Sequence, residues 1–180
     1  HFMQYVSVDT WGVQAEYLRE GLDFNLLWER VHQYLEEVPN YSSLTFIITM
    51  NNLSISNLDK LLNGILELRK TYSKDFQRVW FDTPVLRTPS WQSMQLLPES
   101  YSAKLTSISN WMLDNIETED NMYKGFKDYE INRLERDINW MKEQLSTKYI
   151  NSQKADFYKF FNESDVRHDK SFLTSFPEMQ

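Results

Sequence analysis

Cysteine is absent from this sequence of 180 residues, and glycine and proline are scarce, with four and five residues. Without cysteine the chain has no disulfide, no thiolate zinc site, no cysteine nucleophile and no conventional ligand for an iron–sulfur cluster. The few glycines form no glycine-rich phosphate loop. Apolar runs such as 44–50 fall far short of the roughly 20 residues that span a membrane, and no signal peptide is recognisable. We therefore expect a cytoplasmic protein without a membrane partner.

A basic run is also missing. The formal net charge is -7, from 19 basic and 26 acidic residues that are interspersed along the chain. A nucleic-acid interface concentrates positive charge, so we expect no nucleic-acid partner. Hydrophobic residues make up 41% of the chain and aromatic residues 15%, which suffices for one domain with a substantial core or for part of a larger domain.

The first half of the chain alternates between strand and helix patterns. Short runs rich in aromatic and β-branched residues predict strands, and apolar residues at i, i+3 and i+4 predict helices. Asp23 is placed to cap the first of these helices. The expected strands are 5–9, 44–50 and 79–81, and the expected helices are 24–35 and 58–68. Because the run 44–50 is almost continuously apolar, it favours a parallel strand covered on both faces, within βαβ units.

The pattern changes after Pro98, where strands are no longer indicated. Apolar stripes predict a helix over 101–116, one or two helices over 122–145, and a final helix over 155–161. Asn151 and Ser152 are expected to break the helix that precedes the last one. We therefore divide the chain into an α/β region, 1–97, and a helical C-terminal region, 98–180, packed on it.

Polar residues stand at the end of each expected strand. In parallel sheets and barrels the carboxyl ends of the strands and the loops that follow form the active face. The simpler alternative is that these residues cap helices or make turns. They are Ser7, Asp9 and Thr10 after the first strand, Thr49, Asn51 and Asn52 after the second, and Asp82 and Thr83 after the third.

Two stretches resemble a known family. The run Val6-Ser-Val-Asp-Thr-Trp-Gly12, with the segments 15–21 and Phe24 after it, resembles the middle of a radical S-adenosylmethionine (SAM) barrel. There the fourth strand commonly reads V-S-x-D-G before a segment that contains arginine. Leu86-Arg-Thr-Pro89, Trp91-Gln92 and Leu97-Pro98 resemble the segment after the barrel in the twitch/SPASM-like branch of phage and environmental genomes.

The end of the chain resembles the closing motif of the same branch. His168 is a departure, because a second arginine is usual at that place. The acidic and histidine residues of this segment match no established metal-ligand spacing, so we expect no metal site there. The matching residues are Asp156-Phe-Tyr, Phe160-Phe161, Glu163, Asp165, Arg167, Asp169, Phe172-Leu173 and Phe176-Pro-Glu178.

The resemblance implies roles for the strand-end residues. Ser7 and Arg19 would contact the amino and carboxylate groups of SAM, since the planar fork of an arginine suits a carboxylate. Arg19 could instead be a solvated residue beside Glu16 and Glu20, and the tryptophans could be core residues. The candidate cofactor-binding residues are Ser7, Asp9, Arg19, Thr49 and Asn51. The candidate substrate-pocket residues are Trp11, Asn52, Asp82 and Trp91.

The departure from the family concerns the cluster. Family members carry CxxxCxxC, whose three thiolates hold a [4Fe-4S] cluster that reduces SAM to a radical, and this sequence has no cysteine. The resemblance therefore implies a partial barrel from the C-terminal portion of such an enzyme. It would contribute contacts to SAM and to a small-molecule or peptide substrate. Alone it would be inactive, with neither SAM nor the cluster bound.

Two further expectations concern partners. The first strand of a partial barrel would expose an unpaired edge, which predicts a homodimer through that strand. The rival interpretation is a non-enzymatic binding or adaptor module that presents its helical C-terminal half to a partner. An adaptor should fold with its first strand covered and without a polar pocket, whereas a fragment should look cut open.

Overall fold

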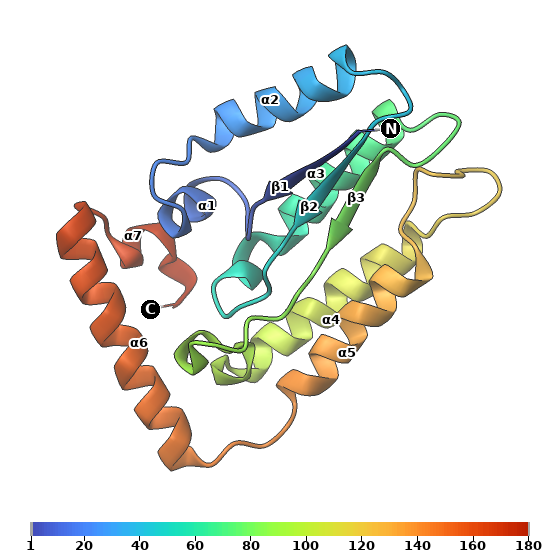
Figure 1. Cartoon of the computed structure of the whole chain (residues 1–180). Helices are drawn as coiled ribbons and strands as arrows, with labels where there is room; N and C mark the ends of the chain where they lie inside the picture. Colours follow the sequence, from blue (N-terminus) through green and yellow to red (C-terminus); the bar gives the residue numbers. More distant parts are fainter. Residues whose placement is uncertain (1, 180) are drawn as a thin grey trace.

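The centre of the fold is a three-stranded parallel sheet (Figure 1), seen here in a computed structural model that describes residues 2–179. The strands are β1 (Met3–Ser7), β2 (Ser43–Ile47) and β3 (Val79–Asp82), in the order β1-β2-β3. The prediction of a mixed α/β chain with three parallel strands is confirmed. The second strand is shorter than the expected 44–50, because pairing stops at Ile47 apart from an isolated bridge between Met50 and Val85.

Three helices and a short 3₁₀ turn fill the two connections between the strands. Helix α1 was not predicted, because its six residues are too few to show a period. Asp23 caps α2 as expected, and its side chain accepts a hydrogen bond of 2.9 Å from the Leu26 amide. The elements are α1 (Val13–Leu18), α2 (Phe24–Glu37), the 3₁₀ turn η1 (Ser54–Asn57) and α3 (Leu58–Tyr72).

Helices α2 and α3 cover the same face of the sheet. Phe46 and Phe81 are register partners on β2 and β3, so their side chains point to the same face. Trp28 of α2 stacks on Phe46 with 5.7 Å between ring centroids, and the guanidinium of Arg69 on α3 lies 5.3 Å from the Phe81 ring. The main core therefore lies between this face and the two helices.

The opposite face of the sheet is open. Tyr5 is 57% exposed, and Thr45, Ile47 and Trp80 are only half-buried. In Figure 1, α3 lies behind the sheet and no described helix passes in front of it. The expectation that the second strand is covered on both faces is therefore wrong. Parallel sheets are almost always covered on both faces, so an open face is unusual.

The helical C-terminal region surrounds the sheet on two sides (Figure 1). Helices α4 and α5 lie against each other on the β3 side, and α6 and α7 lie near α1. Within residues 2–179, no helix is long and apolar enough to cross a membrane. The helices are α4 (Glu99–Asp114), α5 (Asp128–Met141), α6 (Thr147–His168) and α7 (Phe172–Ser175). The short 3₁₀ turns are η2 (Ser90–Gln92), η3 (Met94–Leu96) and η4 (Pro177–Met179).

Helix α6 corrects one prediction. It continues through Asn151 and Ser152, which were expected to break it. The helix propensities of asparagine and serine are only a few tenths of a kcal/mol below average, so packing elsewhere in the helix overrides them. Ser146 caps the first turn by accepting a hydrogen bond from the Tyr149 amide, and Phe161 anchors the helix in a second apolar cluster.

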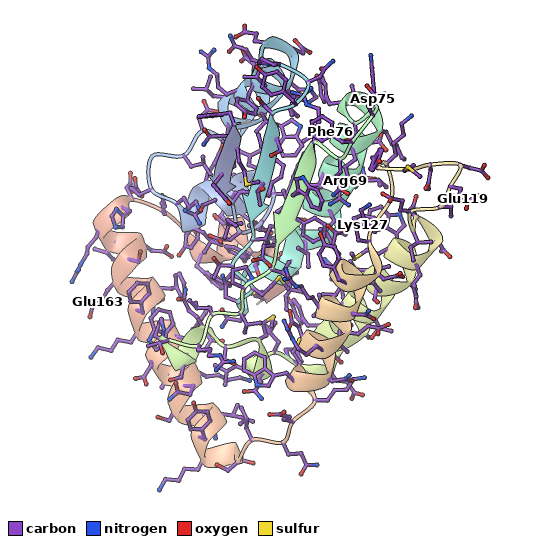
Figure 2. All side chains as sticks on the ribbon, turned by 45° about the vertical axis from the view of Figure 1, so that its right-hand side comes forward. Arg69, Asp75, Phe76, Glu119, Lys127 and Glu163 are labelled. Atoms are coloured by element: carbon purple, nitrogen blue, oxygen red, sulfur yellow. The ribbon has the colours of Figure 1, made fainter. Side chains whose placement is uncertain are left out.

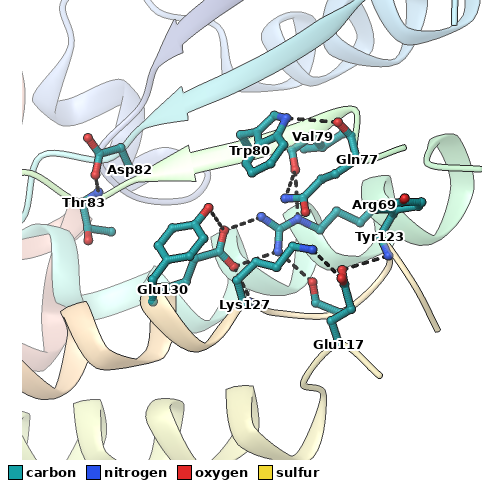
Figure 3. A network of polar contacts seen from close by, with 12 residues as sticks. Arg69, Gln77, Val79, Trp80, Asp82, Thr83, Glu117, Tyr123, Lys127 and Glu130 are labelled. Carbon is teal, nitrogen blue, oxygen red and sulfur yellow. Dashed lines mark hydrogen bonds and ion pairs between the residues drawn. The ribbon is translucent and has the colours of Figure 1, made fainter. Parts of the chain in front are cut away.

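A buried ion pair next to β3 joins α3 to α5 (Figure 3). Arg69 and Glu130 are 0% and 1% exposed, and two hydrogen bonds of 2.6 and 2.9 Å join them. Arg69 also donates to the carbonyls of Val79 and Gly125, both at 2.9 Å, and Glu130 accepts from the amide of Lys127 at 3.0 Å. Buried charges are tolerated when they are paired and hydrogen-bonded in this way.

Candidate functional site

A polar cluster forms where β1 and β2 end. The carboxylate of Asp9 accepts a hydrogen bond from the Thr49 amide at 3.1 Å and another from Arg19 Nε at 3.1 Å. A guanidinium nitrogen of Arg19 lies 3.0 Å from the same carboxylate. Three of the five predicted cofactor-binding residues therefore meet at the carboxyl edge of the sheet. Asp9 and Arg19 come from the connection between β1 and β2, and Thr49 follows the end of β2.

The local sequence explains how Arg19 reaches this edge. Gly12 adopts φ 65°, a left-handed conformation that suits glycine, and it lets the chain turn from the end of β1 into α1. Helix α1 ends at Leu18, and Arg19 follows in an extended conformation. Its neighbour Glu16 accepts from the Phe24 amide at 2.9 Å, and Glu20 pairs with a lysine of the C-terminal tail, so Arg19 pairs with Asp9 rather than with either.

The other two predicted cofactor-binding residues, Ser7 and Asn51, differ in their exposure and in their hydrogen bonds. Ser7 is exposed at the end of β1. Asn51 is 5% exposed, and its Oδ1 accepts from the amides of Leu53 and Ser54 at 2.8 and 3.1 Å, while its Nδ2 donates to the Thr49 carbonyl. Asn51 therefore shapes the turn after β2, as the simpler interpretation of strand-end asparagines expects.

The four predicted substrate-pocket residues separate into three places. Asn52 and Trp91 line one cavity. Trp11 packs edge-on against Phe24 and Trp28, each with centroids 4.7 Å away, and so belongs to the core between α2 and α3. Asp82 forms an ion pair with Arg133 of α5 and accepts from the Thr83 amide, on the β3 side.

The cavity around Asn52 and Trp91 has a volume of about 290 Å³. Its walls come from the loop after β2, the turns η2 and η3, the start of α4, helix α6 and the C-terminal tail. Burial raises the pKa of Tyr101, the Glu178 charge raises it further, and the Ser56 hydroxyl opposes both. The lining residues that sequence patterns did not identify include Tyr101, Phe157, Phe172 and Glu178. For Phe157 and Phe172 the sequence signal was the number of aromatic residues near the C-terminus, which gave no indication of where this segment docks.

The C-terminal tail fastens to α1 next to the strand-end cluster. Tyr17 of α1 donates a hydrogen bond of 2.7 Å to Asp165, whose other oxygen accepts from the Phe172 amide at 2.7 Å. Burial raises the pKa of Tyr17 above its ordinary value, and the hydrogen bond and charge of Asp165 raise it further. Lys170 pairs with Glu20 at 2.7 Å and lowers the pKa of that carboxyl. Two of the three segments that resemble the radical SAM family, the one that begins at Val6 and the end of the chain, are thus in contact.

The strand-end cluster offers groups that suit a polar organic ligand. Arg19 is 36% exposed and uses only part of its five-donor fork on Asp9, so further N–H groups can bind a carboxylate. Among the described residues, no three His, Asp or Glu side chains are grouped so as to hold a metal ion. The cluster can therefore bind and orient a charged group through the protein's own hydrogen-bonding groups.

Comparison with known proteins gives the site no precedent. No protein-family model, no curated protein and no solved structure matches the chain. What the strand-end cluster and the cavity can do therefore follows from their own residues.

Proposed function

We propose that this chain is the C-terminal portion of a radical SAM enzyme, where it contributes contacts to SAM and substrate. The observation that carries the proposal is the open sheet. Within residues 2–179, helices cover only one face of three parallel strands (Figure 1), and the polar cluster of Asp9, Arg19 and Thr49 lies at their carboxyl edge. Parallel strands with helices on the outer face only are what part of an α/β barrel would present, because the inner face is normally covered by the remaining strands.

The side chains on the open face support a partial barrel. Inward and outward side chains alternate along barrel strands. Tyr5 and Ser7 of β1 are exposed, and Ile47 and Trp80 are half-buried on the neighbouring strands. In the proposed enzyme these residues would face the barrel interior, and the helices between the strands would form the outer ring of βαβ units.

The residues fit SAM but not the cluster. Arg19 has donors left for the carboxylate of SAM, and Ser7, two residues before Asp9, is exposed. The chain has no cysteine, so thiolates for a [4Fe-4S] cluster would have to come from other residues of the enzyme. In radical SAM enzymes the cluster and SAM together supply the radical chemistry. We therefore expect the isolated chain to be inactive.

The first test is the coding sequence upstream of residue 1. The proposal expects an in-frame CxxxCxxC motif about half a barrel before it. Given that motif, the longer protein would be prepared without oxygen and its affinity for SAM measured. Arg19→Ala should weaken binding by about tenfold or more, because a charge-assisted contact is lost. The matched control Arg167→Ala removes an arginine that is 73% exposed on α6 and should leave the affinity unchanged.

Either of two outcomes would count against the proposal. If the reading frame starts upstream of residue 1 without encoding a CxxxCxxC motif, the protein lacks the cysteines that radical chemistry requires. If the longer protein binds SAM with equal affinity with and without Arg19, the strand-end cluster is not the SAM site.

A second candidate function is an adaptor module. Helix α6 has 22 residues, of which only Phe161 is buried, while Tyr149, Tyr158 and Phe160 are 41–55% exposed. Exposed aromatic side chains on a helix favour contact with another protein. This function would replace the first if the upstream motif is missing.

A further inference from the structure

Asn52, which lines the cavity beside Trp91, carries a buried acceptor without a protein donor. Asn52 is 5% exposed, and its Nδ2 donates a hydrogen bond of 3.1 Å to the Trp91 carbonyl. A carbonyl oxygen only accepts, so this bond fixes the orientation of the amide and leaves Oδ1 on its other side. Within residues 2–179, Oδ1 accepts no hydrogen bond. A buried acceptor left unpaired is costly, which indicates that a ligand's donor completes it.

The walls of the cavity suit a flat apolar body. Aromatic rings of Trp91, Tyr101, Phe157 and Phe172 line it, and Leu96 and Leu97 add apolar surface. The charged residues Lys154 and Glu178 also line it but are exposed at the surface, whereas Asn52 lies buried. The volume of about 290 Å³ is at the lower end for small-molecule sites, which favours a ligand with a single ring.

We propose that this cavity binds a small aromatic molecule that donates a hydrogen bond, such as a phenol or an aromatic amine. The ring lies among Trp91, Tyr101 and Phe157, and the hydroxyl or amino group donates to Asn52 Oδ1. Aromatic rings pack well against other rings in edge-on and offset geometries, and Trp91 already packs edge-on against Phe157 in this way. Binding requires neither SAM nor a cluster; only the identification of the ligand as a substrate rests on the proposed function.

The donor requirement is tested with three probes of similar shape. The chain alone, without SAM, is titrated with p-cresol, 4-methylanisole and toluene, and binding is followed by ligand-observed NMR and calorimetry. Only p-cresol can donate a hydrogen bond, so it should bind about tenfold more tightly than the other two. Equal affinities for the three probes, or no binding of p-cresol at millimolar concentration, would overturn the proposal.

Two variants locate the binding. Asn52→Leu removes the acceptor, so the preference for p-cresol over toluene should fall to about one. Leu97→Trp enlarges another lining side chain and keeps Asn52 itself, so it should abolish binding of all three probes by filling the cavity. Its matched control is Leu113→Trp, at an exposed position on α4 that does not line the cavity.

The cavity-filling variant keeps the test decisive if Asn52→Leu does not fold, which circular dichroism would reveal. Unchanged p-cresol binding in Leu97→Trp would place the ligand elsewhere and overturn the proposal. Because SAM is absent from every titration, failure here leaves the SAM proposal standing, and failure of SAM binding leaves the cavity standing.

Discussion

The two edges of the sheet differ in how they are covered by the rest of the chain. On the β3 side, α5 is held by the Arg69–Glu130 pair, which is fully desolvated and hydrogen-bonded at nearly every polar atom. On the β1 side, the strand itself is an exposed edge. There the helical region contacts α1 and the residues that follow it, through pairs such as Tyr17–Asp165 and Lys170–Glu20, in which Glu20 is 62% exposed.

This difference teaches where the fold tolerates change. Breaking a polar contact that is shielded from water lowers the free energy of unfolding more than breaking a contact at the surface. The β3 side is therefore fixed, whereas the β1 side exposes backbone groups, an uncovered face and the strand-end cluster. We therefore expect a further strand or a ligand to bind on the β1 side and to leave the β3 side unchanged.

Breaking the closed β3 side should have the largest effect on stability. Glu130→Ala leaves the Arg69 guanidinium buried without its carboxylate, so the free energy of unfolding should fall by about 3–5 kcal/mol, as measured by urea denaturation. The control is Glu163→Ala, which removes an exposed pair with Arg167 on α6, on the opposite side of the molecule from Arg69 (Figure 2). That change should stay within about 0.5 kcal/mol. Similar values for both variants would remove the contrast between the two sides.

The Arg69–Glu130 pair could not be predicted from the sequence. The two residues are 61 positions apart, and charged residues in amphipathic helices normally face water. By contrast, the three strands and α2 follow from local periodicity and capping, which depend only on neighbouring residues. Helix α6 shows the limit of this approach, because it continues through Asn151 and Ser152, where the local sequence suggested a break.

The candidate site, like the fold, was predictable where it depends on local sequence and not where it depends on distant contacts. Asp9 and Thr49 could be expected to meet because parallel strands end at one edge, and the pairing of Asp9 with Arg19 then follows from the short connection through α1. The cavity depends on the C-terminal tail docking more than 100 residues away from Asn52. No local pattern encodes such a contact, so Phe157 and Phe172 were not identified as its walls.

On the β1 side, the Tyr17–Asp165 contact predicts an intermediate, pH-dependent effect. Burial and Asp165 raise the pKa of Tyr17 above the ordinary value of 10.0, and Lys170 lies 5.8 Å from its ring. Below pH 10 the contribution is complete, because Tyr17 is protonated in both states. Above pH 10 the unfolded chain loses a proton that the native state keeps, so stability falls, by up to about 1.4 kcal/mol per pH unit from this residue.

Denaturation of wild type and Tyr17→Phe between pH 8 and pH 11 measures this contribution. The variant should show the smaller loss of stability above pH 10, although other tyrosines with raised pKa values, such as Tyr72 and Tyr129, keep part of the slope. Tyr158→Phe, at a 55% exposed position on α6, is the control and should follow wild type. Identical slopes for all three proteins would mean that the tail does not hold Tyr17 in its protonated form.

The open β1 edge itself should govern association with little effect on stability. Phe2 and Val8 form their backbone hydrogen bonds with β2, and backbone groups alternate along a strand, so the N–H of Tyr5 faces away from the sheet. We predict that two copies pair through β1, as unprotected edges do.

Sedimentation velocity should detect this dimer for wild type and for Tyr5→Thr, which keeps the N–H. Tyr5→Pro should be monomeric, because proline removes the outward donor but no hydrogen bond to β2. A wild-type monomer at every concentration would show that this edge does not pair, and dissociation of Tyr5→Thr would assign the contact to the tyrosine side chain instead of the backbone.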